Sequence, residues 1–200
     1  MSGTVGLHSV YASAAAMAVA VELGVTEATA AAALSKQAPP PGRMRIVPGI
    51  KGSIIIDDSY NASPVALQAA LESLAELKYV KRRIVVLGDM MELGKFSAEA
   101  HKEAGERISR VTDILFTIGP RTRATAAAAQ AAGLDEAQIF QYEKTERAGR
   151  ELQAMLKPGD VVLVKASQSI RAERIVEEVM AEPERAATLL CRQDAAWKRL

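Results

Sequence analysis

The stretch SIIIDDSYNASP, residues 53–64, joins an apolar run to a cluster of polar side chains and ends on a proline. Its first part, Ser53–Ile56, is apolar on both faces, as a buried parallel strand requires. Pro64 suits the first turn of a helix, because backbone N–H groups there have no acceptor within the helix and proline therefore costs no hydrogen bond. The stretch therefore predicts a strand, a polar turn and a helix, which is the first half of a βαβ unit.

The same alternation continues downstream. Further strands are expected at Ile84–Leu87, Ile114–Ile118, Gln138–Tyr142 and Val161–Val164. Helices are expected at Pro64–Leu77, Ala98–Arg110, Thr122–Ala132, Thr145–Leu156 and Ile170–Met180. Strands alternating with helices of this length indicate an α/β fold, a Rossmann-like, open and mostly parallel sheet with helices on both faces.

Upstream of the sheet the pattern is helical. One helix is expected at Val10–Leu23, closed by Gly24, and a second at Glu27–Leu34, capped by Thr26. The prolines and glycine of residues 38–42 then form a boundary that no helix or strand can cross. We divide the chain into a helical segment, an α/β domain and a C-terminal tail with a short helix, at residues 1–48, 49–181 and 182–200.

The composition is that of a globular protein. Of 200 residues, 49% are hydrophobic, enough to bury a core, and the net charge of +1 argues against a nucleic-acid partner. No window reaches the roughly 18 apolar residues that a membrane span requires. The single cysteine, Cys191, leaves no internal disulfide and fits a reducing compartment. We expect a cytoplasmic monomer without membrane insertion.

Ligands of open parallel sheets bind outside the carboxyl ends of the strands, and three polar loops fall there. Residues 57–64 offer carboxylates and an amide, residues 88–94 (GDMMELG) offer glycines, and residues 165–171 (KASQSIR) offer hydroxyls before a helix. Each loop also has a purely structural explanation in turn geometry or in helix capping by Asp58, Ser59, Ser63, Ser167 or Ser169. Together the loops predict one shared ligand-facing edge.

Several other reactive side chains are expected to be structural. His101 lies on a polar helix pattern and is expected in solvent, and Met90 and Met91 are expected to pack under their loop. Trp197 and Cys191 are expected to pack within the tail. Because no second thiol or histidine cluster accompanies them, no metal site is predicted.

The three loops resemble segments of the Mur ligase family. Residues 57–64 are similar to the signature that opens the family's third domain, residues 88–94 to its next loop, and residues 162–169 to its Lys-Gly-Ser strand end. Residues 6–12 and 41–44 resemble the end of the family's central ATP-binding domain, although Ser9, Ala12 and Ala166 depart from the usual residues. The resemblance is to the branch that adds D-alanyl-D-alanine. It implies that residues 1–48 are a helical remnant of the central ATPase domain.

This resemblance implies an ATP-dependent, amide-forming ligase of peptidoglycan synthesis. Such a ligase uses ATP and Mg²⁺ to turn a carboxylate of UDP-N-acetylmuramoyl-tripeptide into an acyl phosphate, which the amine of D-alanyl-D-alanine then attacks. The third domain closes over the site, orienting the reactants and excluding water. The family's glycine-rich phosphate loop and magnesium ligands lie upstream of the His8 motif and are absent from this sequence. We therefore expect the chain alone to bind ATP poorly and to catalyse nothing.

Carried over residue by residue, the resemblance implies two sets of binding residues and no catalytic residue. Nucleotide contacts are expected from Asp58, which would meet the ribose, and from Asn61, Arg43, Tyr60 and His8. D-alanyl-D-alanine would be held by Lys165, Ser167, Ser169 and Asp89. An ammonium group and helix-end donors suit the dipeptide carboxylate.

Two alternatives remain. The chain could be a stand-alone, non-catalytic module of the same fold that holds a nucleotide or a small peptide. It could also belong to a sister ligase that adds another amino acid or glutamate, although residues 57–64 and 88–94 argue against this.

Overall fold

The computed structural model describes residue 3 and residues 5–199, with the side chains of Leu7 and His8 left out. Its centre is a six-stranded sheet in the order β1-β2-β6-β3-β4-β5. The strands are β1 (Arg45–Pro48), β2 (Ile54–Asp58), β3 (Arg82–Gly88), β4 (Ile114–Ile118), β5 (Ile139–Tyr142) and β6 (Asp160–Lys165). β2 to β6 run parallel, and β1 pairs antiparallel with β2. The expected α/β fold with a mostly parallel sheet is confirmed.

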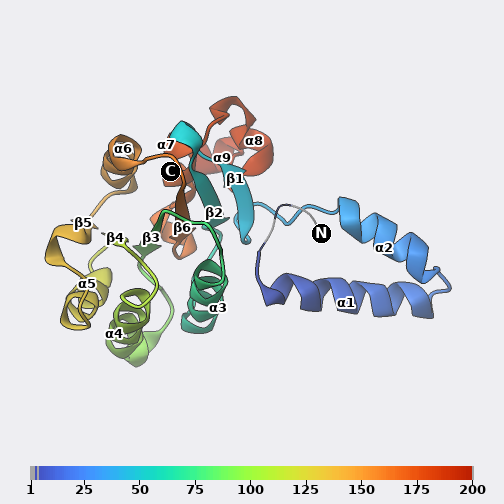
Figure 1. Cartoon of the computed structure of the whole chain (residues 1–200), viewed down its shortest axis with the longest axis horizontal. Coiled ribbons are helices and arrows are strands. Elements are labelled where there is room, and N and C mark those ends of the chain that lie inside the picture. The colour runs from blue at the N-terminus through green and yellow to red at the C-terminus, as the bar shows by residue number, and fades with distance from the viewer. Residues whose placement is uncertain (1–2, 4, 200) are drawn as a thin grey trace.

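Helices cover both faces of this sheet (Figure 1). One face carries α3 (Pro64–Ala75), α4 (Ser97–Ile108) and α5 (Thr122–Ala131), and the other carries α6 (Thr145–Met155), α7 (Glu173–Val179) and α8 (Ala186–Leu189). Short 3-10 turns are η1 (Ile50–Gly52), η2 (Gly94–Phe96), η3 (Glu136–Gln138), η4 (Gln168–Ile170) and η5 (Pro183–Arg185). The last helix is α9 (Ala195–Lys198).

Two apolar cores, one on each face, hold the sheet between its helices. Ile55 packs in the core that contains Ile175 of α7, while its neighbour Ile56 packs in the core that contains Leu71 of α3. Side chains alternate between the faces of a strand, so adjacent isoleucines can only both be buried if both faces are covered. Each such side chain contributes about 1.5–3 kcal/mol by its burial.

β1 was not among the expected strands. Its register with β2 runs from Arg45 opposite Asp57 to Pro48 opposite Ile54, so the sheet begins before residue 49. Pro48 is tolerated because β1 is an edge strand, where one side of the backbone needs no ladder partner.

The two N-terminal helices, α1 (Leu7–Glu22) and α2 (Glu27–Lys36), form a hairpin that stands away from the sheet (Figure 1). Gly24 closes α1 in a left-handed conformation (φ 83°), and the Thr26 side chain accepts a hydrogen bond from the Thr29 N–H at the start of α2. Among the described residues, no helix is long and apolar enough to cross a membrane.

The C-terminal tail forms two short helices, α8 and α9, in place of the single short helix expected. Leu189 and Leu190 pack into the core beside α7, and the chain then returns toward the carboxyl ends of β2 and β6. The tail therefore borders the predicted ligand-facing edge.

Candidate functional site

A buried ion pair joins the ends of two adjacent parallel strands, β2 and β6. Asp58 ends β2 opposite Lys165, which ends β6. Lys165 Nζ donates to Asp58 Oδ2 at 2.5 Å and to the Asn61 carbonyl oxygen at 3.1 Å, and its side chain is only 2% exposed. The other Asp58 oxygen accepts the Met44 N–H. Two residues that were expected to hold different ligands thus hold each other, and together they fix the turn at Asn61.

Asp57, the neighbour of Asp58, ties the entry to the domain to the same strand end. Its carboxylate accepts the N–H of Gly42 at 3.1 Å, and the N–H and hydroxyl of Ser59 at 3.2 and 2.6 Å. Burial raises the pKa of Asp57 to about 6, against the hydrogen bonds from Ser59, which lower it. This residue therefore positions the turn that precedes Arg43.

A first cleft of about 430 Å³ lies between this turn and α3. It is lined by Arg43, Met44, Asp58, Asn61, Ala62, Ser63, Val65, Ala66, Ala69, Ala70 and Lys165. Ser63 caps α3 by accepting the Ala66 N–H, which confirms the capping explanation for that residue. The Arg43 guanidinium lies 4.4 Å from the centre of the Tyr60 ring, which is 41% exposed. This pairing holds the Arg43 guanidinium of the cleft wall against an aromatic ring, although Tyr60 itself is not a lining residue.

A second cleft, of about 710 Å³, lies beside the first. Its lining residues are Asn61, Met91, Glu92, Ser167, Gln168, Ser169, Arg171 and Trp197. Asn61 lines both clefts, and its exposed side chain stands where they meet. The Ser167 hydroxyl accepts the Met91 N–H at 2.8 Å, so this serine joins two of the predicted loops.

Asp89 lies outside both clefts. It is 1% exposed, and its Oδ1 accepts the backbone N–H groups of Arg121 and Thr122 at 2.9 Å each. The Arg121 guanidinium contacts the second oxygen at 3.4 Å. The carboxylate therefore caps the start of α5 and points away from the expected dipeptide residues, whereas the backbone carbonyl of Asp89 accepts the Ser167 N–H at 3.1 Å. His8 lies in the first turn of α1, and its side chain is outside the described part of the chain.

The prediction that His101 is in solvent is wrong. The ring is fully buried, accepting the Met90 N–H at Nε2 (3.1 Å) and lying 2.8 Å from the Ser97 carbonyl oxygen at Nδ1. Because Nε2 accepts, Nδ1 carries the proton and donates to Ser97. Met90 is buried as expected. The sequence pattern of α4 is polar, but the loop of residues 88–94 folds over the histidine and covers it.

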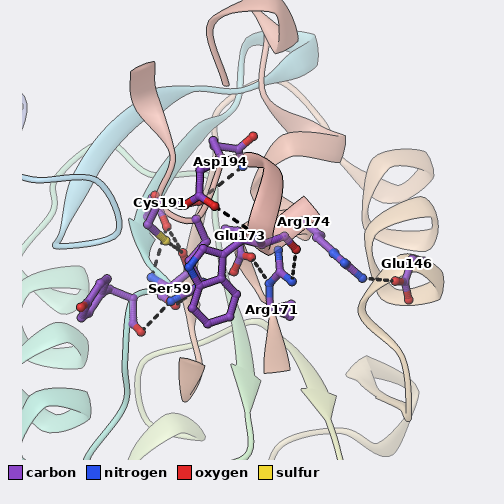
Figure 2. Close-up of polar contacts among 12 residues, drawn as sticks. Ser59, Glu146, Arg171, Glu173, Arg174, Cys191 and Asp194 are labelled. Atoms are coloured by element: carbon purple, nitrogen blue, oxygen red, sulfur yellow. Dashed lines mark hydrogen bonds and ion pairs between the residues drawn. The ribbon is translucent and has the colours of Figure 1, made fainter. Parts of the chain in front are cut away.

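Sequence reasoning missed a cluster of charged residues at the edge of the second cleft (Figure 2). Glu173 is fully buried, and its carboxylate accepts from Arg171 Nε at 2.5 Å and from Arg192 Nη2 at 2.6 Å. Arg171 and Trp197 are lining residues of the cleft. No sequence motif marks this cluster, because it joins residues of the α7 entry to the distant tail.

The described residues contain no group of three or more His, Cys, Asp or Glu side chains that could hold a metal ion. The donors at the two clefts are instead amide, hydroxyl and guanidinium groups, and the one carboxylate deep in the first cleft, that of Asp58, is paired with Lys165. These groups suit organic ligands that carry hydroxyl, phosphate or carboxylate groups.

The fold and the two clefts define a Rossmann-like ligand-binding domain whose site lies at the carboxyl edge of a parallel sheet. The family described as "Mur ligase, glutamate ligase domain" matches residues 42–168, and the chain belongs to the Mur ligase family.

Similar proteins place it near one branch of that family. The UDP-N-acetylmuramoyl-tripeptide–D-alanyl-D-alanine ligase of Bacillus subtilis is 31% identical over 179 residues, which is 89% of this chain and 39% of the relative. The ligase of the same name from Mycobacterium tuberculosis is 32% identical over 201 residues, covering 90% of this chain and 39% of the relative. The solved MurF ligase of Thermotoga maritima in complex with ADP shares 33% identity at a TM-score of 0.67, over 86% of this chain and 37% of that one. The chain thus spans about two fifths of the length of these relatives.

Proposed function

We propose that this chain acts as the closing, C-terminal domain of a ligase that adds D-alanyl-D-alanine to UDP-N-acetylmuramoyl-tripeptide in peptidoglycan synthesis. The relatives that carry this name, at 31–32% identity, support the substrate assignment. The observation that carries the proposal is the pair of adjoining clefts that meet at Asn61. Two ligands that react in one site need neighbouring sites of this kind.

The first cleft is assigned to the nucleotide. Its volume of about 430 Å³ and its alanine-rich wall fit a small organic ligand, and the solved Thermotoga relative is a complex with ADP. Arg43 and Tyr60 would contact the base or a phosphate at the rim, and Asn61 would reach the ribose. Asp58 is 7% exposed and spends one oxygen on Lys165, so its contact with a ribose would use the remaining lone pairs.

The second cleft is assigned to the dipeptide. Ser169 and Gln168 are exposed at its wall, and Ser167 fixes the loop through Met91. Lys165 is 2% exposed and paired, so we assign it the role of a positioning residue that holds Asp58 and the Asn61 turn. Lys165 also lines the first cleft and not the second, so it does not face the proposed dipeptide site.

In the whole ligase, ATP with Mg²⁺ would supply the phosphoryl group that activates the tripeptide carboxylate as an acyl phosphate. The dipeptide amine would attack that carbonyl carbon, and inorganic phosphate would leave as the new amide forms. This chain would bind the nucleoside end of ATP, orient the amine and exclude water when it closes. None of these roles requires a metal ligand from this chain.

The isolated chain is expected to show no ATP hydrolysis that depends on D-alanyl-D-alanine, since its clefts offer no phosphate-binding loop. ADP release followed in the presence and absence of the dipeptide checks this. Dipeptide-dependent turnover by the purified chain would contradict it.

Chemical-shift mapping of the amide groups tests the two assignments separately. Titration with ADP is expected to shift the amides of residues 58–63, 65 and 66, and titration with D-alanyl-D-alanine those of residues 167–171, both at millimolar ligand because the closing partner domains are absent. Arg43→Gln is expected to weaken ADP binding, whereas Arg123→Gln, a matched loss of an exposed arginine that pairs with Glu143, leaves it unchanged. A chain whose spectrum is unmoved by either ligand would refute the proposed function.

A further inference from the structure

An arginine of the C-terminal tail holds the tail against the β2–α3 turn of the candidate site. Arg192, 8% exposed, donates to the carbonyl oxygens of Ser59 at 2.7 Å and Tyr60 at 3.0 Å, and its guanidinium also pairs with the buried Glu173. The carboxylate of Glu173 is thereby shared by two arginines, Arg192 and Arg171. The tail, the β2–α3 turn and the entry to α7 form one hydrogen-bonded unit (Figure 2).

Arg171 lines the second cleft, and hydrogen bonds fix its guanidinium there. Its Nε donates to Glu173, and its Nη1 donates to the Trp197 carbonyl oxygen at 2.8 Å, with the Trp197 ring centre 5.1 Å from the guanidinium. The residue is 9% exposed and lines the cleft. Its Nη2 has no hydrogen-bond partner among the described residues. Its backbone is left-handed (φ 62°), a conformation that a residue other than glycine adopts at a cost and that is often found at ligand sites.

Arg171 is the one cation among the described residues that line the second cleft. Two guanidinium groups share the Glu173 carboxylate, and the Asp57 carboxylate also acts on Arg192, so Glu173 is not the only anion that balances the two arginines. The other charged residue of the cleft, Glu92, is exposed, and water screens its carboxylate. Glu173 and Trp197 fix the planar guanidinium at Nε and Nη1, which leaves Nη2 able to donate to a carboxylate.

We propose that Arg171, held by Glu173 and by the tail through Trp197 and Arg192, is the carboxylate-binding group of the second cleft. The ligand would be a small peptide with a free C-terminal carboxylate, whose apolar part would lie against Trp197. This inference rests on the proposed function for the dipeptide but replaces Lys165 with Arg171 as the cation. Because Trp197 lines the cleft and Arg192 ties the tail to Glu173, the tail contributes one wall residue and its support to this site.

Binding of D-alanyl-D-alanine to the full chain, followed by amide shifts, tests the proposal with a matched pair of variants. Arg171→Gln is expected to weaken binding at least about tenfold, equivalent to about 1.4 kcal/mol. Arg174→Gln removes the same charge from the same helix region. Arg174 points away to Glu146 and lies outside both clefts, so this control is expected to bind as the wild type (Figure 2). The dipeptide amide, which lacks the carboxylate, is expected to bind the wild-type chain and Arg171→Gln equally weakly.

A second variant tests the same cleft in case Arg171→Gln does not fold. Trp197→Ala truncates a half-buried side chain near the end of the chain and leaves Glu173 with both of its arginines. It is expected to weaken the dipeptide several-fold while ADP binding stays unchanged, and unchanged dipeptide binding would count against the proposal.

The possible failures are distinguishable. If Arg171→Gln, folded by its spectrum and thermal midpoint, binds D-alanyl-D-alanine as the wild type does, the proposal is overturned while the dipeptide function stands. If acetate shifts the amides around Arg171 but the dipeptide binds no better than acetate, the carboxylate site stands and the dipeptide function falls.

Discussion

Asp57 gives the structure a pH dependence that can be measured. The side chain is fully buried, and burial raises its pKa to about 6 from an ordinary value of 3.8. Replacing it by Asn removes this titration and keeps one oxygen to accept from Ser59. The amide nitrogen of Asn would face the Gly42 N–H that the second carboxylate oxygen now accepts. That mismatch changes the free energy of unfolding by an amount that does not vary with pH.

The magnitude follows from proton linkage. Between about pH 4 and pH 6 the folded chain keeps a proton on Asp57 that the unfolded chain has released, so stability is lost as the pH rises through this window. A pKa difference of about 2, at about 1.4 kcal/mol for each pKa unit, gives a loss on the order of 3 kcal/mol. The contribution is fully present below about pH 4 and absent above about pH 6.

Urea unfolding of both proteins across this pH range is the assay, because the other carboxylates titrate alike in each and cancel in the difference. The free energy of unfolding of the wild type, minus that of Asp57→Asn, is expected to fall by about 3 kcal/mol from the acid to the neutral end. A difference that stays constant with pH would refute the reasoning, since Asp57 would then have the same pKa folded and unfolded.

Three further predictions concern the site and its support. Lys165→Met leaves the Asp58 carboxylate buried without its partner and is expected to cost about 3–5 kcal/mol in urea unfolding; adding Asp58→Asn should recover part of this, and a double variant no more stable than the single one would contradict the pairing. Gly105→Ala places a Cβ 2.2 Å from the Thr125 carbonyl oxygen between α4 and α5 and is expected to cost about 1–3 kcal/mol, so an unchanged melting temperature would be inconsistent with this packing. Asn61→Ala is expected to weaken both ADP and D-alanyl-D-alanine in the shift titrations, and an effect on neither ligand would speak against a shared wall.

The parallel strands and their helices could be predicted because their signals are local. Runs such as Ile114–Ile118 are apolar on both faces and are bounded by helical patterns, and this run matches β4 at both ends. β1 carries no such signal. It is four residues long, next to a proline-rich boundary, and is held by its ladder to β2 and by bonds to distant residues such as Ala181, whose N–H donates to the Pro48 carbonyl oxygen. Its pairing is a tertiary effect that local periodicity does not reveal.

The sequence predicted that the site lies at the carboxyl edge of the sheet, but it did not predict which residues of the site contact one another. The order β2-β6-β3 makes Asp58 and Lys165 neighbours across more than one hundred residues of sequence, and the sequence alone does not give that order. Without it, the two residues were assigned to separate ligands. The burial of His101 and the union of Arg171 with the tail depend in the same way on segments that meet only in the folded chain.

A crystal structure of the chain with bound ADP tests the central claim, that the carboxyl edge of the sheet holds a nucleotide and a dipeptide in adjoining clefts. The account predicts the nucleoside in the first cleft, with its ribose beside Asn61 and Asp58 and its base or phosphate at Arg43 and Tyr60, and with the second cleft still open. ADP bound elsewhere, for example on the outer surface between α4 and α5, would contradict it.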